Sequence, residues 1–158
     1  LWFDRPDGER PQSLIVEGLL PVIADLGLST ERVALYGWGS GGYGAILLLE
    51  RLGIERVTAV ASTSPALFSR WDEVDGYYAD EAEYERLDAF DRIGLLEQVP
   101  YRVTCGDEDP FADEVERFRA AFPVAPVGGI EAGCRDQAYW HRAHPDMLAY
   151  LAPSLGPS

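Results

Sequence analysis

The most informative part of the chain is residues 32–46, which read RVALYGWGSGGYGAI. The apolar and β-branched residues at 32–37 predict a short strand that ends in glycine, and residues 42–53 predict a helix that ends in a glycine cap. A glycine-rich turn between a strand and a helix has two common uses. It binds the phosphates of a nucleotide at the helix N-terminus, or it presents a catalytic nucleophile on a sharp elbow.

The alternation of strand and helix continues on both sides of this turn. Strands are expected at 56–62, 101–106 and 124–129, and helices at 11–28 (kinked at Pro21), 111–122 and 136–151. Strands separated by long helical segments indicate a parallel sheet flanked by helices. At 158 residues the chain is long enough for one domain with a core, so we predict a single α/β domain over residues 1–158.

One region departs from this alternation. Residues 72–91 contain nine acidic side chains against one arginine, together with Tyr77, Tyr78 and Tyr84. This composition predicts a solvated insertion, at about 68–92, that forms a lid over the carboxyl edge of the sheet. A cation-binding surface is the alternative, although runs of charge usually form solvated faces.

The composition excludes some classes of partner. The net charge of −14 argues against nucleic acid, because the chain offers little positive charge to neutralise phosphates. No apolar run reaches the roughly 18 residues of a membrane span. The first ten residues, LWFDRPDGER, do not form a signal peptide, so we find no targeting signal, and both a cytoplasmic and a secreted location stay open.

The cysteines and histidines do not predict a metal site. Cys105 and Cys134 are either two thiols or one disulfide. Only His141 and His144 could add nitrogen ligands, and their spacing to the cysteines does not match a zinc site. We expect neither a metal nor another cofactor.

The nucleotide interpretation of the turn uses Gly37, Gly39 and Gly42. It requires an acidic residue at the end of the next strand to bind the ribose. That strand is followed by STSPA, and no acidic residue occurs between Glu55 and Asp72. Nucleotide binding is therefore kept only as an alternative.

The elbow interpretation requires small residues two positions before and after the nucleophile, where side chains would collide in the sharp turn. If Ser40 is the nucleophile, one of these positions is Trp38, which is too large. If position 39 is central, the flanking residues are Gly37 and Gly41, but Gly39 has no side chain. The spacing thus predicts a well-formed elbow without a nucleophile.

The run RVALYGWGSGGYGAILL resembles the elbow of the esterase D/antigen 85-like branch of the α/β-hydrolases, which typically reads Leu-x-Gly-Trp-Ser-x-Gly-Gly-Tyr-Gly-Ala. The resemblance places the nucleophilic serine of that family on Gly39. It places on Ser40 the next residue, whose backbone N–H serves the oxyanion hole.

Three later segments extend the resemblance. ASTSPALF (61–68) is similar to the Ser-Pro-Ala-Leu segment of the family. VTCGDEDPF (103–111) is similar to its acid loop and implies that the triad acid is Asp109. GGIEAGCRDQAYW (128–140) is similar to its histidine loop and implies that the triad histidine is replaced by Arg135.

This resemblance implies an α/β-hydrolase-like fold, with a mostly parallel sheet, that lacks the N-terminal strands of the full fold. The exposed edge of such a sheet would be covered by a second copy in a homo-oligomer or by a missing N-terminal part. It also implies a small acyl or ester ligand.

Catalysis should be lost at two of the three triad positions. Gly39 has no nucleophilic atom, and Arg135 cannot act as a base because a guanidinium stays protonated. We therefore predict an inactive protein that is retained for binding or for structure. The alternative from the same resemblance is an active esterase or acyltransferase that uses Ser40 with Asp109 and a histidine.

Other side chains gain a role from the resemblance. Asp109 either caps the following helix or pairs with Arg135, and we favour the pair. A disulfide between Cys105 and Cys134 would join the acid and histidine loops. Four aromatic residues are expected to pack rather than to contact a ligand: Trp38, Tyr43, Tyr139 and Trp140.

Overall fold

The computed structural model describes residues 2–5, 8–74 and 76–156. Its strands form one parallel sheet in the order β1-β2-β3-β4. Their bounds are Val33–Trp38 for β1, Val57–Thr63 for β2, Tyr101–Gly106 for β3 and Val127–Glu131 for β4. The predicted parallel α/β sheet is confirmed.

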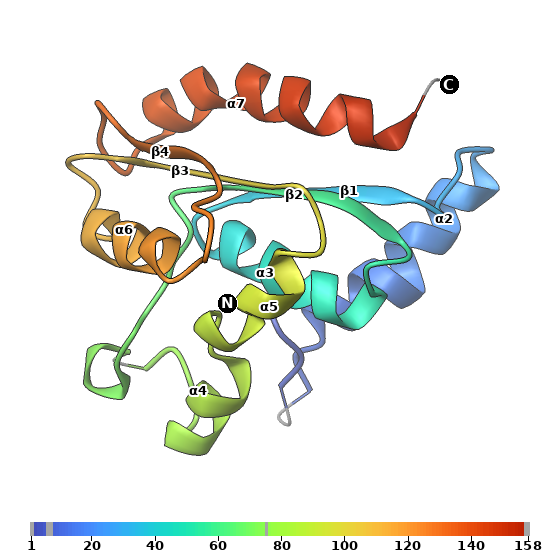
Figure 1. The fold of residues 1–158 in the computed structure, drawn as a ribbon. Coiled ribbons are helices and arrows are strands. Elements are labelled where there is room, and N and C mark those ends of the chain that lie inside the picture. The colour runs from blue at the N-terminus through green and yellow to red at the C-terminus, as the bar shows by residue number, and fades with distance from the viewer. Residues whose placement is uncertain (1, 6–7, 75, 157–158) are drawn as a thin grey trace.

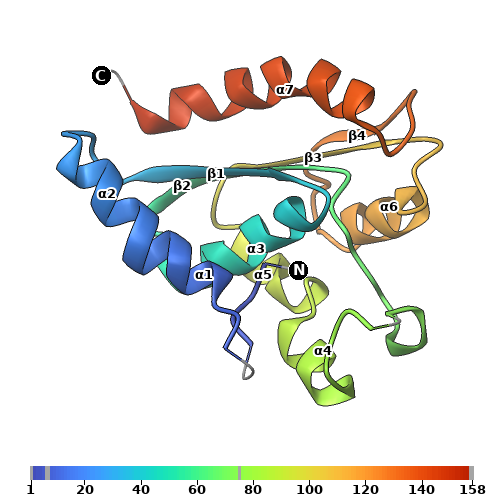
Figure 2. The same cartoon turned by 180° about the vertical axis from the view of Figure 1, so that it is seen from behind.

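Helices cover both faces of this sheet. They are α1 (Pro11–Ser13), a π-helical segment (Leu14–Leu19), α2 (Leu20–Asp25), α3 (Ser40–Leu52), α4 (Glu81–Leu87), α5 (Ile93–Leu96), α6 (Ala112–Ala120) and α7 (Gln137–Leu151), with 3-10 turns at Trp71–Glu73, Phe90–Arg92 and Ala152–Leu155. Figure 1 shows α7 on one face, with α3, α5 and α6 on the other. Seen from behind in Figure 2, α1 and α2 run alongside β1.

The two faces of β2 illustrate the packing. Val60 belongs to the large core on the side of α3, whereas Ala59 and Ala61 pack with Met147 of α7. All four side chains are fully buried. The small alanines let α7 lie close to the sheet, and the branched valine fills the wider space on the opposite side.

The first helix is irregular near Pro21, where the sequence predicted a kink. Its middle part, Leu14–Leu19, is π-helical and directly precedes the turn that contains the proline. Proline has no N–H to continue the helical hydrogen bonds, and a π-helical segment is one way in which a helix adapts to such an interruption. The helix ends at Asp25, earlier than predicted.

The fourth strand begins later than predicted. It starts at Val127 rather than at 124, and Val124 is exposed. Pro126 cannot donate a hydrogen bond to the ladder, so regular pairing starts directly after it.

The acidic segment at 72–91, whose Asp75 lies outside the described residues, is attached to the core by two tyrosines. Tyr78 and Tyr84 are buried in the core, and the Tyr78 hydroxyl donates to the Tyr43 hydroxyl of α3 at 3.0 Å. Tyr43 in turn donates to the Leu87 carbonyl at 2.7 Å. The acidic side chains therefore alternate with aromatic anchors that fix the segment to α3.

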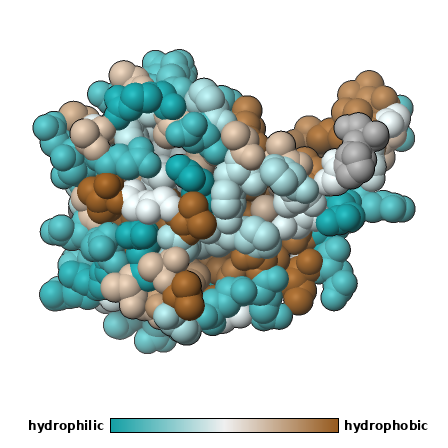
Figure 3. Space-filling model, turned by 45° about the horizontal axis from the view of Figure 1, so that its top comes forward, coloured by the Kyte–Doolittle hydropathy of each residue, from teal (hydrophilic) through white to brown (hydrophobic). Residues whose placement is uncertain are grey.

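The outer edge of β1 is a free sheet edge, since β2 is its only partner among the described strands. Several large apolar side chains of the first helix and the loop after it are exposed: Leu14, Leu19, Val22, Leu26 and Leu28. Figure 3 brings the side of α7 forward, and most of the surface that it shows is hydrophilic. Apolar residues on this surface gather toward the part that projects at the right. No helix in the described part of the chain is long and apolar enough to cross a membrane.

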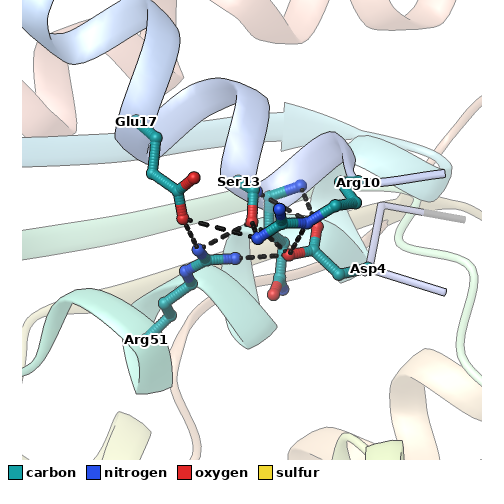
Figure 4. A network of polar contacts seen from close by, with 6 residues as sticks. Asp4, Arg10, Ser13, Glu17 and Arg51 are labelled. Atoms are coloured by element: carbon teal, nitrogen blue, oxygen red, sulfur yellow. Dashed lines mark hydrogen bonds and ion pairs between the residues drawn. The ribbon is translucent and has the colours of Figure 1, made fainter. Parts of the chain in front are cut away.

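A polar network fixes the N-terminal segment to α3 (Figure 4). Asp4 accepts hydrogen bonds from the N–H groups of Gln12 and Ser13, and it forms an ion pair with Arg51 at 2.7 Å. Burial alone would raise the pKa of Asp4, but the hydrogen bonds from Ser13 and Arg51 outweigh it and lower the pKa to about 2. This contact holds the neighbouring Trp2 and Phe3 against the body of the protein.

Candidate functional site

The ends of the four strands bring the candidate site together. Trp38 of β1 pairs in register with Thr63 of β2, and Thr63 pairs with Thr104 of β3. The loops that follow these strands therefore leave the sheet at the same edge. In open α/β sheets this carboxyl edge is where ligands bind.

The turn between β1 and α3, which the sequence analysis interprets as an elbow, is sharp and closely packed. Gly39 lies between the two elements with φ 56° and ψ −127°, a conformation that residues with a side chain adopt only under strain. A Cβ atom on Gly37 would lie 2.2 Å from the carbonyl oxygen of Gly41, so no larger residue fits at position 37 without a shift of the backbone.

Gly41 differs from the expectation. We expected both flanking glycines to avoid a clash between side chains, but a Cβ atom on Gly41 would meet no atom within 4 Å. The crowding comes from the backbone of Gly41, which faces Gly37. The turn therefore requires glycine at only one of the two positions.

Arg135 and Asp109 form an ion pair beside this elbow. Nη1 of Arg135 donates to the two carboxylate oxygens of Asp109 at 3.3 and 3.4 Å, and to the carbonyl oxygen of Ser64 at 2.9 Å. The Asp109 side chain is fully buried, and that of Arg135 is 23% exposed. The guanidinium also lies 4.5 Å from the centre of the Phe111 ring.

Asp109 pairs with Arg135 but is not the N-cap residue of α6, which is Phe111. Besides the pair with Arg135, its carboxylate accepts a hydrogen bond from the Phe111 N–H at 2.9 Å, immediately before α6 begins. The same carboxylate thus orders the start of the helix and neutralises the guanidinium.

The other amino group of Arg135 points to the elbow. Nη2 lies 3.1 Å from the point that a Cβ atom on Gly39 would occupy. The three positions that the sequence analysis singled out as a triad therefore lie side by side in space, in the order 39, 135 and 109. In a serine hydrolase a histidine lies between the nucleophile and the acid. In this structure the Arg135 guanidinium lies between Gly39 and Asp109.

Ser64 is a member of this site that the sequence analysis missed as an individual residue. It has φ 48°, the only positive φ of a non-glycine residue in the described part of the chain. Its N–H donates to the Thr104 carbonyl at 2.7 Å, and its own carbonyl accepts from Arg135. Strain of this kind is stored where the surroundings fix the backbone, and here it aims a carbonyl at the guanidinium.

Ser40 is the first residue of α3, and the structure gives it no histidine partner. Among the described residues neither histidine forms a hydrogen bond with it. His141 is exposed, and the His144 ring packs 5.3 Å from that of Tyr36 and 6.1 Å from that of Trp38. His141 is therefore solvated, and His144 packs against aromatic rings.

The expected disulfide between Cys105 and Cys134 is not formed. Cys105 is buried and Cys134 is exposed, and both are free thiols. Cys105 donates weakly to the Ser64 hydroxyl at 3.9 Å, whereas Cys134 donates to the Glu108 carboxylate at 2.8 Å. The two loops do meet, but their thiols turn toward different partners.

A cavity of about 800 Å³ opens beside the elbow. Its lining includes Gly39, Ser40, Gly41 and Arg135. Six aromatic side chains also line it: Trp2, Tyr36, Trp38, Tyr77, Phe111 and Trp140.

The aromatic residues divide into two groups. Tyr43 and Tyr139 are buried, as predicted for packing residues. Trp38 and Trp140 stack on each other with ring centres 6.1 Å apart, but they also line the cavity, which the prediction missed. Trp2 was missed as well, although Gly44 leaves room for it: a Cβ atom on Gly44 would lie 2.4 Å from Trp2 Cβ.

Comparison with known proteins supports the fold rather than a particular activity. No protein-family model matches the sequence, and no curated protein does. Among solved structures, the chain is similar to a ferulic acid esterase, with a TM-score of 0.79 and 23% identity over 98% of this chain and 65% of that one.

Two further solved structures are similar to the chain. An S-formylglutathione hydrolase from Agrobacterium tumefaciens has a TM-score of 0.74 and 18% identity over 98% of this chain and 61% of that one. An enterochelin esterase from Shigella flexneri has a TM-score of 0.68 and 16% identity over 92% of this chain and 37% of that one. The chain spans less than two thirds of the length of each of these structures. It therefore has the α/β-hydrolase fold, in the form seen in these esterases and over part of their length.

Proposed function

We propose that this chain is an esterase-like α/β-hydrolase that has lost its catalytic chemistry and is retained for binding a small acyl or ester ligand, or for a structural role. One observation carries the proposal. The Arg135 guanidinium lies between a buried Asp109 and an elbow position, Gly39, that has no side chain.

The chemistry of these two residues supports inactivity. Acyl transfer by a serine hydrolase requires a hydroxyl that attacks the carbonyl, and a base that takes the hydroxyl proton and returns it to the leaving group. Gly39 has no hydroxyl, and a guanidinium gives up its proton only far above physiological pH. Removing such groups leaves only the small rate enhancement that binding and an oxyanion hole provide.

The alternative with Ser40 as nucleophile has less support. Its backbone begins α3, and no histidine hydrogen bond activates its hydroxyl within the described residues. Nucleotide binding is likewise weaker, since the glycines have packing roles. A Cβ on Gly37 would meet Gly41, and one on Gly42 would lie 3.2 Å from Pro65 Cβ.

Ester hydrolysis and active-site labelling test the proposal. We expect no turnover of p-nitrophenyl acetate above the rate with a Ser40→Ala variant, and no covalent labelling by a fluorophosphonate probe. Labelling of wild-type protein that maps to Ser40 and disappears in Ser40→Ala would overturn the proposal. Stabilisation against heat by NAD or ATP would instead support the nucleotide alternative.

A reversal experiment tests the assignment of positions. The double variant Gly39→Ser with Arg135→His restores a hydroxyl, an imidazole and the existing Asp109. We expect this variant to react with the fluorophosphonate probe at position 39, and each single variant to stay unlabelled. Because the fold covers only part of its relatives, the double variant is also tested in any longer polypeptide that contains this chain.

The free edge of β1 belongs to the same proposal. Its unpaired backbone groups, next to exposed apolar side chains of the first helix, are suited to further strands from a preceding segment or from a second copy. Light scattering after size-exclusion chromatography measures whether the chain is a monomer or a dimer. A dimer that dissociates when Leu14 and Val22 are changed to Lys supports a second copy, and a monomer argues against it.

A further inference from the structure

The cavity beside the elbow has the size of a small-molecule site. Its volume of about 800 Å³ lies within the range of roughly 300–1,000 Å³ that is typical for such pockets. Its lining combines the Arg135 guanidinium and the start of α3 with several aromatic side chains, of which Phe111 lies 4.5 Å from that guanidinium.

The polar part of the lining offers donors without a matching acceptor. In the described part of the chain, all hydrogen bonds that the structure gives Arg135 leave from Nη1, which contacts Asp109 and Ser64. Nη2 faces the elbow, where Ser40 and Gly41 form the first turn of α3. A guanidinium edge matches the geometry of a carboxylate, and the N–H groups at the start of a helix favour the same charge.

The other walls are aromatic and open to solvent. Trp2 is 42% exposed, Trp38 41% and Tyr77 43%, which makes them the three most exposed aromatic side chains in the described part of the chain. Tyr36, Phe111 and Trp140 also line the cavity. Exposed aromatic groups that gather around one cavity suit a flat apolar ligand, which would remove them from water.

The overall charge limits the kind of anion. With a net charge of −14, the protein repels ions that carry several negative charges, such as phosphates. Since Asp109 already pairs with Arg135, the remaining donors at Nη2 suit one carboxylate rather than a multiply charged anion. A ligand with one carboxylate and an aromatic ring fits both parts of the lining.

We infer that this cavity binds an aromatic monocarboxylate, with its carboxylate on Nη2 of Arg135 and the first N–H groups of α3, and its ring between Trp2, Trp38 and Tyr77. This inference rests on the proposed function, because an intact triad would place a nucleophile and an imidazole where the carboxylate is bound. The substitution of an imidazole by a guanidinium thus changes the site from one that cleaves an ester to one that retains an acid.

Three small probes separate the contributions to binding. Phenylacetate carries both the ring and the charge, phenylacetamide has the same shape without the charge, and acetate has the charge without the ring. Isothermal titration calorimetry, together with tryptophan fluorescence, measures each of them. We expect phenylacetate to bind at least about tenfold more tightly than either of the others. In the comparison with phenylacetamide, the hydrogen bond to a charged group contributes roughly this much.

Substitutions at Arg135 test whether its guanidinium binds the carboxylate of the ligand. We expect Arg135→Met to weaken phenylacetate binding by about tenfold or more, and to leave phenylacetamide binding unchanged. Because this change leaves the Asp109 carboxylate buried without its partner, the double variant Asp109→Asn with Arg135→Met is measured as well. The control is Arg32→Met, which removes the same charge at the opposite end of β1, where Arg32 donates one hydrogen bond among the described residues, to the Ser154 carbonyl at 3.2 Å.

The outcomes distinguish this inference from the proposed function. Equal affinity for phenylacetate and phenylacetamide, no binding of phenylacetate, or unchanged binding in the folded double variant would overturn the inference. Inorganic phosphate that binds as tightly as phenylacetate would overturn it too. Ester turnover or labelling of Ser40 on the same sample would instead contradict the proposed function.

Discussion

Nη2 of Arg135 lies 3.1 Å from the point at which a side chain on Gly39 would begin. The two residues are 96 positions apart in the sequence, and under the proposed function each stands at the position of a catalytic triad member. A glycine at position 39 leaves the space into which the arginine extends. The two substitutions therefore fit each other physically.

Gly39→Ser alone should destabilise the protein without making it active. A residue with a side chain at φ 56° costs about 1–3 kcal/mol, and the new Cβ also crowds Arg135. Urea denaturation should show a lower midpoint, and the fluorophosphonate probe should not react. A variant as stable as the wild type would show that the elbow is less strained than its dihedral angles indicate.

Gly37→Ala and Gly41→Ala form a matched pair across the same turn. Alanine at 37 would place its Cβ 2.2 Å from the backbone oxygen of Gly41, whereas alanine at 41 would meet no atom within 4 Å. We expect Gly37→Ala to lower the melting temperature strongly, and Gly41→Ala to leave it unchanged or to raise it slightly through better helix propensity. Equal effects of the two changes would contradict the geometry of the turn.

Arg135→Met should destabilise the protein by about 3–5 kcal/mol, because it leaves the fully buried Asp109 carboxylate without its cation. Adding Asp109→Asn should recover much of this loss. Chemical denaturation of both single variants and the double variant gives the coupling energy between the two residues. Additive effects would mean that the ion pair does not stabilise the folded state.

The free energy of unfolding should decrease at low pH, partly because Asp4 becomes protonated. The folded-state pKa of Asp4 is lowered to about 2 from its usual 3.8, so its contribution is complete above the unfolded value. That contribution is lost as the pH falls from 3.8 through 2. Asp4→Asn should therefore reduce stability at neutral pH and flatten the loss between these values, as measured by urea midpoints. Asp146→Asn, which changes an exposed carboxylate on α7, is the control and should keep the wild-type slope.

The two thiols should differ in reactivity. Burial raises the pKa of Cys105 to about 12, so iodoacetamide should modify it only after unfolding. Cys134 is exposed, and its hydrogen bond to Glu108 raises its pKa, so alkylation should be slow at neutral pH and faster as the pH rises. Mass spectrometry of native and unfolded protein measures both. A mass that changes on addition of reductant would show that the disulfide forms after all.

Much of the fold could be predicted because its signals are local. Runs such as VTAVAS and YRVTCG bury both faces and separate helices of amphipathic pattern, which specifies a parallel sheet. The spacing of Gly37, Gly39 and Gly41 likewise predicted an elbow. The predicted boundaries of helices and strands differed from the structure where proline interrupts backbone hydrogen bonding, as near Pro21 and Pro126.

The sequence alone determined that positions 39 and 135 lack a nucleophile and a base, since this depends only on which atoms the side chains carry. Only the tertiary structure decided how those residues meet. It turned one amino group of Arg135 toward Asp109 and the other toward Gly39, left Cys105 and Cys134 with different partners, and placed Trp2 and Tyr77 beside Trp38 around one cavity. The direction of a side chain depends on packing with residues far away in the chain, and local sequence patterns do not contain that information.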